Sequence, residues 1–324
     1  MSSDKFRLNK DTKIYVAGHK GLIGSAFIRR LKSDKYNNVI TATRAELELT
    51  NSQDVDNFFS SYQPEVVIFA AGKVGGIMNN RDYPADFIQT NLNIQLNVFR
   101  AAQQYGAKKL IFFGSSCMYP RVTEQPMSED QICTGHLEPT SIAYATAKYT
   151  GVQMCQAINR QNGAVSFIPV IPNSAYGPND NFDLNNSHVL SALIKRLHEA
   201  KQNNTTSVTL WGTGEPKREF VYSDDIADAC LLLLNSNLSY DDLPINIGVG
   251  EDISIKELAQ KIKNITGYRG DINWDNSKPD GTLRKLLDNS RITKLGWKAK
   301  VGLDDGLKEV YQWYINHRNN IVQR

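Results

Sequence analysis

A glycine-rich turn between an apolar strand and a helix, close to the N-terminus, constrains the fold of this chain more than any other feature. The segment KIYVAG at 13–18 alternates into a short apolar strand, and the GHKGLIG that begins at its last residue has the composition of a turn. The following SAFIRRLKSD at 25–34 predicts a helix whose apolar face carries Ala26, Phe27 and Leu31. The sequence therefore predicts a β-turn-α opening.

Further apolar strands alternate with helical patterns along the first half of the chain. The strand candidates are NVITAT (38–43), EVVIFAA (65–71), KLIFFGSS (109–116) and AVSFIPVI (164–171). Apolar strands that alternate with amphipathic helices form a parallel sheet covered on both faces. The sequence therefore predicts an α/β protein built on a doubly wound, Rossmann-type parallel sheet.

The regular alternation ends after this half of the chain. The segment PNSAYGPNDNFDLNNS (172–187) is rich in Asn, Pro and Gly and predicts a long loop, which in a compact domain is often functional. Later strand and helix signals predict a smaller C-terminal α/β lobe that binds substrate over the strand ends. The predicted division is an NADP-binding domain at 1–171, with a returning segment at about 218–250, and a substrate-binding lobe at 172–217 and 251–324.

The spacing of Gly18, Gly21 and Gly24 between a strand and a helix predicts dinucleotide binding more strongly than a plain tight turn. A pyrophosphate can approach the N–H groups at a helix N-terminus only where no Cβ obstructs it. Those N–H groups and the helix dipole favour an anion. We therefore expect this turn to bind the phosphates of a nucleotide cofactor.

The residues after the second predicted strand bear on which nucleotide is bound. An NAD-binding chain usually carries an acidic residue there, whereas ATRAEL offers Arg44 first. Arg44, together with Lys20 from the glycine turn, could pair with a 2′-phosphate, which favours NADP(H) as cofactor. In the alternative, both are solvated surface cations and Glu46 or Glu48 binds the ribose.

Tyr144 and Lys148 lie four residues apart, which places them on one face of a predicted helix. A lysine ammonium beside a phenol is expected to lower the phenol pKa, so that the tyrosine can exchange a proton with an oxygen near neutral pH. Ser115 follows a predicted strand earlier in the chain. Together with the nucleotide turn, these residues predict a carbonyl reductase in which Tyr144 is the acid.

The composition limits the classes of partner. The 324 residues carry a formal net charge of +3 without a run of five basic residues, which argues against nucleic-acid binding. The N-terminal segment is polar and no apolar run reaches the roughly 18 residues of a membrane span, so we expect a cytoplasmic protein with no membrane partner. Four cysteines without CxxC spacing predict reduced thiols and no metal site: Cys117, Cys133, Cys155 and Cys230.

Longer motifs join these separate signals. They include AGHKGLIGSA, TRAELEL, KVGGIMNNRDYPADFIQTN, GSSCMYP, AYATAK, YGPNDNF, NSHV, WGTGEPKREFVYSDD and SKPDGTLRKLLD. In these motifs the chain resembles, nearly end to end, the extended short-chain dehydrogenase/reductase family, and within it the GDP-L-fucose synthases. KVGGI, SSCMYP and NSHV are specific to that branch. The resemblance implies an NADPH-dependent enzyme that epimerises C3 and C5 of GDP-4-keto-6-deoxy-D-mannose and reduces C4 to give GDP-L-fucose.

The resemblance also implies roles for individual residues. Ser115 would hydrogen-bond the C4 oxygen, Tyr144 would protonate it, and Lys148 would hold the nicotinamide ribose. Cys117 and His188 would be the acid/base pair of epimerisation, for which reference pKa values of about 8.5 and 6.5 are suitable. Four further residues would surround the substrate: Arg196, Trp211, Arg218 and Lys285.

Each of these residues also has a simpler interpretation when it is considered alone. Cys117 could be a buried small hydrophobe, and His188 could be a surface residue that opens a helix. Trp211 could be part of the core, Arg196 could be one polar position on an amphipathic helix, and Lys285 could be a solvated loop lysine. The agreement of the motifs is what favours the functional interpretation.

The chain departs from the family pattern in three places. It has TSIAY (140–144) where the family typically reads N-E-P before the tyrosine, and it differs at IPNSAYGP (171–178) and AAGKVGGIMNN. Because these segments flank the expected sugar pocket, the alternative is a C4 reductase, with partial or no epimerase activity, for a related GDP-4-keto-6-deoxy sugar such as a heptose. A non-enzymatic alternative is an NADPH-sensing binding module. The resemblance further implies a homodimer formed through two helices per subunit.

Overall fold

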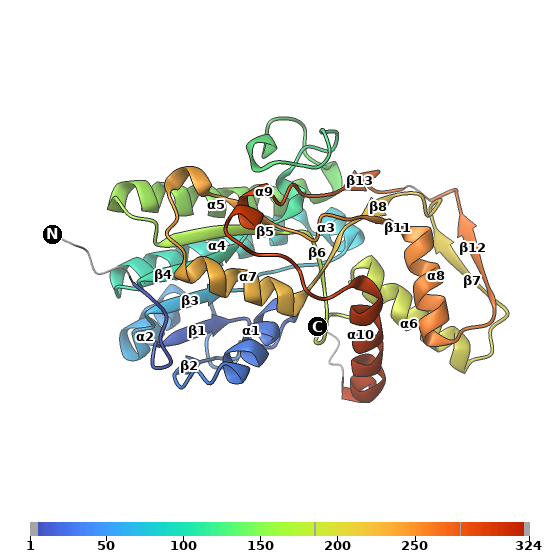
Figure 1. Cartoon of the computed structure of the whole chain (residues 1–324), viewed down its shortest axis with the longest axis horizontal. Coiled ribbons are helices and arrows are strands. Elements are labelled where there is room, and N and C mark those ends of the chain that lie inside the picture. The colour runs from blue at the N-terminus through green and yellow to red at the C-terminus, as the bar shows by residue number, and fades with distance from the viewer. Residues whose placement is uncertain (1–5, 185, 279, 321–324) are drawn as a thin grey trace.

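A six-stranded parallel sheet forms the centre of the computed structural model, which describes residues 6–184, 186–278 and 280–320 (Figure 1). The strand order is β10-β5-β4-β3-β1-β2, and every neighbouring pair is parallel. The strands are β1 (Ile14–Ala17), β2 (Val39–Ile40), β3 (Val66–Phe69), β4 (Lys109–Phe113), β5 (Phe167–Pro172) and β10 (Ile245–Ile247). The predicted α/β, Rossmann-type sheet is therefore confirmed.

Helices cover both faces of this sheet (Figure 1). The first face carries α1 (Leu22–Ser33) and α7 (Ser223–Asn235), and the second carries α2 (Ser52–Tyr62), α4 (Pro84–Gln104) and α5 (Ile142–Asn162). Alternate residues of β1 serve the two faces. Ile14 and Val16 join the core under α1 and α7, whereas Tyr15 and Ala17 join the core under the other three helices. Continuous apolar strands are needed because both faces are buried.

The first helix begins earlier than its apolar pattern predicts. It starts at Leu22, directly from the glycine turn, with Gly21 as its N-cap residue. Ala26, Phe27 and Leu31 are fully buried, as predicted. Burying a side chain the size of Phe27 or Leu31 stabilises the fold by about 1.5–3 kcal/mol. This face therefore anchors the glycine turn against the sheet.

Two other predicted boundaries were partly wrong. The strand predicted at 38–43 is confined to β2, an edge strand whose residues are only half-buried. The loop predicted at 172–187 contains β6 (Ser174–Tyr176), which pairs in parallel with β9 (Phe220–Tyr222). Pairing with a distant segment gives these backbone groups hydrogen-bond partners that a local sequence pattern does not reveal.

A smaller α/β lobe lies beside the sheet (Figure 1). It contains α6 (Val189–Gln202), α8 (Ile255–Thr266), α10 (Leu303–His317) and a parallel pair of strands, β7 (Ser207–Trp211) and β12 (Asp271–Asp275). Leu197, Ile262 and Val310 belong to a third apolar core inside this lobe. The predicted C-terminal α/β lobe is therefore present, while its assignment to substrate binding stays a prediction.

Short strands and a buried carboxylate join the central sheet to the smaller lobe. β8 (Lys217–Arg218) pairs with β11 (Ile253–Ser254) and with β13 (Arg284–Lys285). Glu219, between β8 and β9, is fully buried and its carboxylate accepts hydrogen bonds from the side chain of Asn173 and from the backbone of Val249, Gly250 and Leu287. A buried carboxylate requires such donors. This network therefore holds β13 in place beside the main sheet.

Two further short α-helices lie within the described ranges. α3 (Ile77–Asp82) precedes α4, and α9 (Ser290–Lys294) follows β13. Within the described ranges, no helix is long and apolar enough to cross a membrane.

Candidate active site

The glycine turn at the N-terminus of α1 presents bare backbone. Gly18 has φ +79°, and a Cβ there would lie 2.9 Å from the backbone of Ala70. A Cβ at Gly24 would overlap the carbonyl oxygen of Gly18. No described side chain accepts a hydrogen bond at the Gly21 cap, and Lys20 is exposed within the turn. The helix N-terminus is therefore open to an anion.

Arg44 lies in the turn after β2, with its side chain 86% exposed and its Nε atom 2.7 Å from Oε2 of Glu48. Glu48 also accepts hydrogen bonds from Thr50, and Glu46 accepts two from Thr43. Both carboxylates of the alternative ribose site are thus engaged in local hydrogen bonds. An exposed ion pair contributes only about 0–1 kcal/mol, so a phosphate can replace Glu48 as the partner of Arg44.

Ser115, Tyr144 and Lys148 meet where β4 ends and α5 begins. The Tyr144 hydroxyl is hydrogen-bonded with Ser115. The Lys148 Nζ atom donates to the carbonyl of Phe113 at 2.8 Å and lies 5.8 Å from the centroid of the Tyr144 ring. Lys148 is only 5% exposed, because the α5 face that carries it packs on the sheet. The predicted serine, tyrosine and lysine therefore share one site.

Burial controls the protonation of this group. Burial raises the pKa of the Tyr144 phenol, the charge of Cys117 acts in the same direction, and the hydrogen bond with Ser115 opposes them. The expectation that Lys148 lowers this pKa was therefore wrong. Lys148 is itself buried, which lowers its pKa to about 8, and its ammonium points to the Phe113 carbonyl. The phenol is held protonated, which is the form that donates a proton.

Cys117 lies in a short 3-10 helix (Ser116–Met118) directly after Ser115. Its Sγ atom lies 3.8 Å from Nζ of Lys285 on β13, and hydrogen bonds with Ser115 and Ser141 also involve this thiol. Burial opposes ionisation, but Lys285 and the two hydroxyls outweigh it, so that the pKa of Cys117 is lowered. The interpretation of Cys117 as an inert hydrophobe is therefore wrong, because the side chain is half-buried in a polar setting.

The other residues expected around a substrate differ in their surroundings. Burial lowers the pKa of the Arg218 guanidinium on β8, while electrostatic interactions with Cys117 and Asp280 oppose that shift. Trp211, at the end of β7, is 58% exposed, so the core interpretation of this residue is wrong. Arg196 is half-buried on α6. Arg218 thus lies within electrostatic range of the thiol, whereas Trp211 and Arg196 lie on the smaller lobe.

His188 is exposed and is the N-cap residue of α6, as the interpretation of a surface residue that opens a helix predicts. It interacts electrostatically with the carboxylate of Asp180, which is 9% exposed. Burial raises the pKa of Asp180, whereas His188 and hydrogen bonds from Ser191 and Asn181 oppose this shift. In the described part of the chain, His188 forms no hydrogen bond with Cys117. The assignment of Cys117 and His188 as the epimerisation pair stays a prediction.

The glycine turn, the serine, the tyrosine and the lysine fall in a region that matches a known family. The model of the NAD dependent epimerase/dehydratase family matches residues 14–248. The chain belongs to this family. GDP-L-fucose synthase 1 of Arabidopsis thaliana is 50% identical to it over 309 residues, which are 95% of this chain and 95% of that protein.

Solved structures resemble this epimerase/dehydratase family member along its whole length. A GDP-6-OMe-4-keto-L-xylo-heptose reductase from C. jejuni has a TM-score of 0.91 and 38% identity, over 96% of this chain and 100% of that one. A GDP-L-fucose synthetase from Naegleria fowleri bound to NADP has a TM-score of 0.89 and 28% identity, over 99% and 98% of the two chains. These similarities extend across both the sheet and the smaller lobe.

Three features of this epimerase/dehydratase site were missed by the sequence analysis. Ser141 contacts the Cys117 thiol from TSIAY, one of the segments that depart from the family pattern. Asp180 interacts electrostatically with His188 and belongs to YGPNDNF. This motif contributed to the family resemblance, but its acidic residue was not singled out. Lys285 was assigned to the substrate, and only the pairing of β13 with β8 reveals its contact with the thiol.

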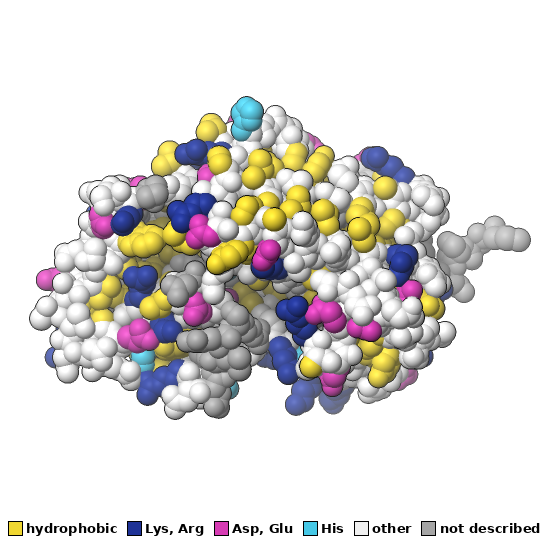
Figure 2. Space-filling view, turned by 180° about the vertical axis from the view of Figure 1, so that it is seen from behind, with side chains coloured by type: hydrophobic (Ala, Val, Ile, Leu, Met, Phe, Trp, Pro, Cys, Tyr) yellow, Lys and Arg dark blue, Asp and Glu magenta, His cyan; other side chains and the backbone are white. Residues whose placement is uncertain are grey.

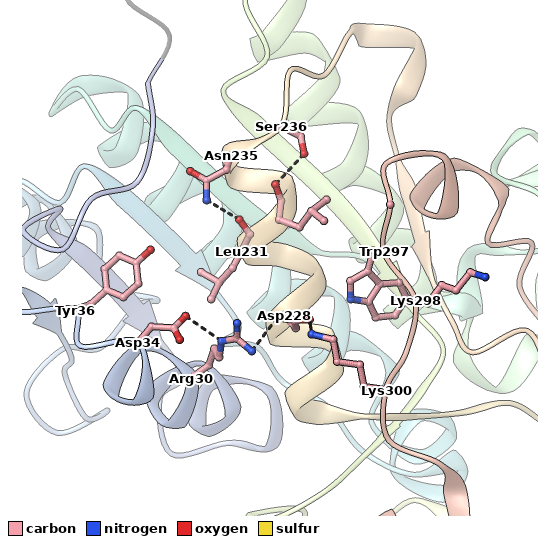
Figure 3. Close-up of a pocket in the computed structure, with 12 residues that line it drawn as sticks. Arg30, Asp34, Tyr36, Asp228, Leu231, Asn235, Ser236, Trp297, Lys298 and Lys300 are labelled. Atoms are coloured by element: carbon pink, nitrogen blue, oxygen red, sulfur yellow. Dashed lines mark hydrogen bonds and ion pairs between the residues drawn. The ribbon is translucent and has the colours of Figure 1, made fainter.

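A separate cavity is lined by none of the candidate site residues described above. This cavity of about 580 Å³ lies between α1, α7 and the segment around Trp297 (Figure 3). Arg30 on its wall pairs with Asp34 and Asp228, and Lys300 pairs with Asp228 as well. These charged groups neutralise one another, and none of the residues lining the cavity is a predicted site residue.

The cysteines and the possible metal ligands were also considered in the sequence. The four cysteines carry free thiols. Across the described ranges, no group of three or more His, Cys, Asp or Glu side chains is arranged to hold a metal ion.

Proposed function

We propose that this enzyme uses NADPH to epimerise C3 and C5 of GDP-4-keto-6-deoxy-D-mannose and to reduce C4, with GDP-L-fucose as product. The observation that carries the proposal is the convergence of a protonated phenol, a serine hydroxyl and an acidified thiol on one point: Tyr144, Ser115 and Cys117. The first two suit a carbonyl oxygen, and the thiol suits removal of a proton from the adjacent carbon. The name of the Arabidopsis relative supports this substrate.

The residues of the glycine turn and of the β2 edge fit NADP(H). Gly18 and Gly24 let the turn pack closely against Ala70 and against its own backbone, and Gly21 leaves the α1 N-terminus without a capping side chain, which suits a pyrophosphate. The exposed side chains of Arg44 and Lys20 suit the 2′-phosphate. NADPH, when bound, supplies the hydride for C4. The NADP-bound structure of the Naegleria relative supports this choice of cofactor.

Reduction at C4 needs a proton on the carbonyl oxygen. Ser115 and Tyr144 hydrogen-bond that oxygen, and Tyr144 donates its proton as negative charge develops there. Lys148, whose pKa is lowered to about 8, is still largely protonated near neutral pH. Its ammonium, which donates to the Phe113 carbonyl beside the tyrosine ring, holds the nicotinamide ribose.

Epimerisation at C3 and C5 uses the same ketone. The hydrogen bonds from Ser115 and Tyr144 stabilise the enolate that forms when Cys117 removes the neighbouring proton. His188 then returns a proton to the opposite face of the sugar ring. Inversion requires the two groups to act from opposite faces of the sugar ring, one to take the proton and the other to return it.

The smaller lobe, together with Arg218 on β8 at its border with the cofactor-binding part, supplies the remaining contacts to the GDP-sugar. We assign 1–171 and about 218–250 to the cofactor, and 172–217 and 251–324 to the substrate. Arg196 and Arg218 carry guanidinium forks that suit the diphosphate, and the exposed face of Trp211 suits a sugar or base.

The proposal is tested by incubating the protein with GDP-4-keto-6-deoxy-D-mannose and NADPH in heavy water and identifying the product by NMR. We expect GDP-L-fucose with deuterium at C3 and C5, because each inversion exchanges one proton with solvent. A D-configured product without deuterium contradicts epimerisation and leaves a C4 reductase.

A second candidate is reduction of a GDP-4-keto heptose. The similarity to the heptose reductase from C. jejuni favours it, as do the departures of TSIAY and IPNSAYGP from the pattern of the synthases. The same assay with a GDP-4-keto-6-deoxy-heptose separates the two candidates. A higher kcat/KM for the heptose than for the hexose would identify the heptose as the substrate.

Arg44→Ala is expected to reduce the preference for NADPH over NADH by about tenfold or more, since a charge-assisted contact contributes about 1.5–3 kcal/mol. The loss should appear in kcat/KM for NADPH, with little change for NADH. Glu48→Gln is the matched control, because it removes the partner of Arg44 and retains the cation. An unchanged preference in Arg44→Ala would show that the 2′-phosphate binds elsewhere.

We further propose a cytoplasmic homodimer formed through α4 and α5. These helices pack side by side, and Leu96 on α4 is 53% exposed. Figure 2 shows apolar side chains gathered across the upper part of the face opposite to that of Figure 1, which is the face that these helices cover. Sedimentation of the protein and of Leu96→Lys tests the dimer, because a charge in a buried interface should release monomers.

A further inference from the structure

Lys285 and Cys117 meet from segments that are far apart in the sequence. The two atoms, Nζ and Sγ, are 3.8 Å apart, and the lysine side chain is half-buried. The backbone that delivers the ammonium is anchored, because β13 pairs with β8 and the Lys285 carbonyl accepts hydrogen bonds from Asn173 and Glu219. Because the backbone is already fixed, only side-chain entropy is lost when the ammonium holds an anion.

Hydroxyl groups and cations near the sulfur favour a negative charge on it. Ser115 and Ser141 form hydrogen bonds with the thiol. Tyr144 on α5 also interacts with the sulfur, and its phenol is kept protonated, so that it adds no opposing negative charge. Arg218 on β8, directly opposite Lys285 in the strand register, is a second cation that interacts with it. Asp280 faces Arg218, which leaves Lys285 as the cation in contact with the sulfur.

We propose that Lys285 holds Cys117 in its thiolate form and is a positioning residue for proton removal, in place of the substrate contact that the family resemblance implies. In the step that follows, the thiolate takes the proton from carbon, and the C–H electron pair moves into the enolate with its charge on the C4 oxygen. Lys285 keeps its proton throughout. The catalytic consequence rests on the proposed function, whereas the state of the thiol does not.

Lys285→Met tests the inference because it removes the charge and preserves the length of the side chain. The pH dependence of Cys117 alkylation by iodoacetamide is followed by mass spectrometry of the peptide that contains it. We expect the midpoint to rise by about 1–3 pH units, which is the usual effect of losing an opposite charge at such a distance. Alkylation near pH 7 should slow about tenfold or more, because only the thiolate reacts. Lys285→Arg should restore a low midpoint.

Lys217→Met is the matched control. Lys217 is an exposed residue of the paired strand β8, so the variant removes the same charge close to the site without touching the thiol. An unchanged midpoint in Lys285→Met overturns the inference, and so does an equal rise in Lys217→Met. Thermal melting checks the fold, and Lys285→Gln carries the same test if Lys285→Met is unfolded.

The alkylation assay needs no sugar, which separates this inference from the proposed function. A protein that does not turn over any GDP-4-keto sugar, but whose alkylation midpoint depends on Lys285, refutes the function and keeps the inference. A rise in KM for the GDP-sugar in Lys285→Met, with an unchanged midpoint, shows that Lys285 binds substrate. That result overturns the inference and leaves the function standing.

Discussion

Tyr144→Phe is expected to lower NADPH-dependent reduction of the 4-keto sugar by about 10²–10⁴-fold, the usual contribution of a general acid. The phenol is hydrogen-bonded with Ser115, and burial holds it protonated. Without its hydroxyl, the C4 oxygen retains only the serine as a donor and must take its proton from water. Steady-state NADPH oxidation measures the rate, and quenching of protein fluorescence measures NADPH affinity, which should stay close to that of the unaltered protein.

Tyr149→Phe is the matched control for this experiment. Tyr149 lies on the same helix, α5, and is half-buried beside the core under α2, α4 and α5. Loss of its hydroxyl should leave turnover within about twofold, since surface and half-buried changes away from the chemistry have small effects. Normal turnover in Tyr144→Phe would remove Tyr144 from the mechanism. A parallel loss of NADPH binding would instead give it a structural role.

Cys117→Ser is expected to slow the exchange of solvent deuterium into C3 and C5 by about 10²–10⁴-fold, and to affect hydride transfer less. The serine hydroxyl is nearly the same size and can keep the hydrogen bonds with Ser115 and Ser141. It does not ionise near neutral pH, however, even with Lys285 beside it. NMR of the product and NADPH oxidation in the same heavy-water sample report the two steps separately.

Cys133→Ser provides the comparison for the thiol. Cys133 is also half-buried, but burial raises its pKa, so it is not expected to act as a base. Its replacement should leave both exchange and reduction unchanged. Equal losses of exchange and reduction in Cys117→Ser would contradict the assigned role, because they would indicate general damage to the pocket rather than the loss of one proton acceptor.

Local sequence patterns predicted the fold of the sheet and the central residues of the candidate site. The strand, the glycine turn and the helix at 13–34 could be predicted because apolar periodicity and glycine spacing act within a few residues. Tyr144 and Lys148 could be paired because one helical turn separates them. The same reasoning failed for β6, whose partner β9 lies more than forty residues away.

The amino-acid sequence by itself determined the doubly wound sheet, the nucleotide turn and the tyrosine–lysine pair, since each depends on neighbours along the chain. Only the tertiary structure decided that Lys285 meets Cys117, across a separation of 168 residues, and that burial rather than Lys148 sets the pKa of Tyr144. Burial and the distance between charges depend on every element packed around a group. The protonation of this site is therefore a property of the packed fold, which no single stretch of sequence contains.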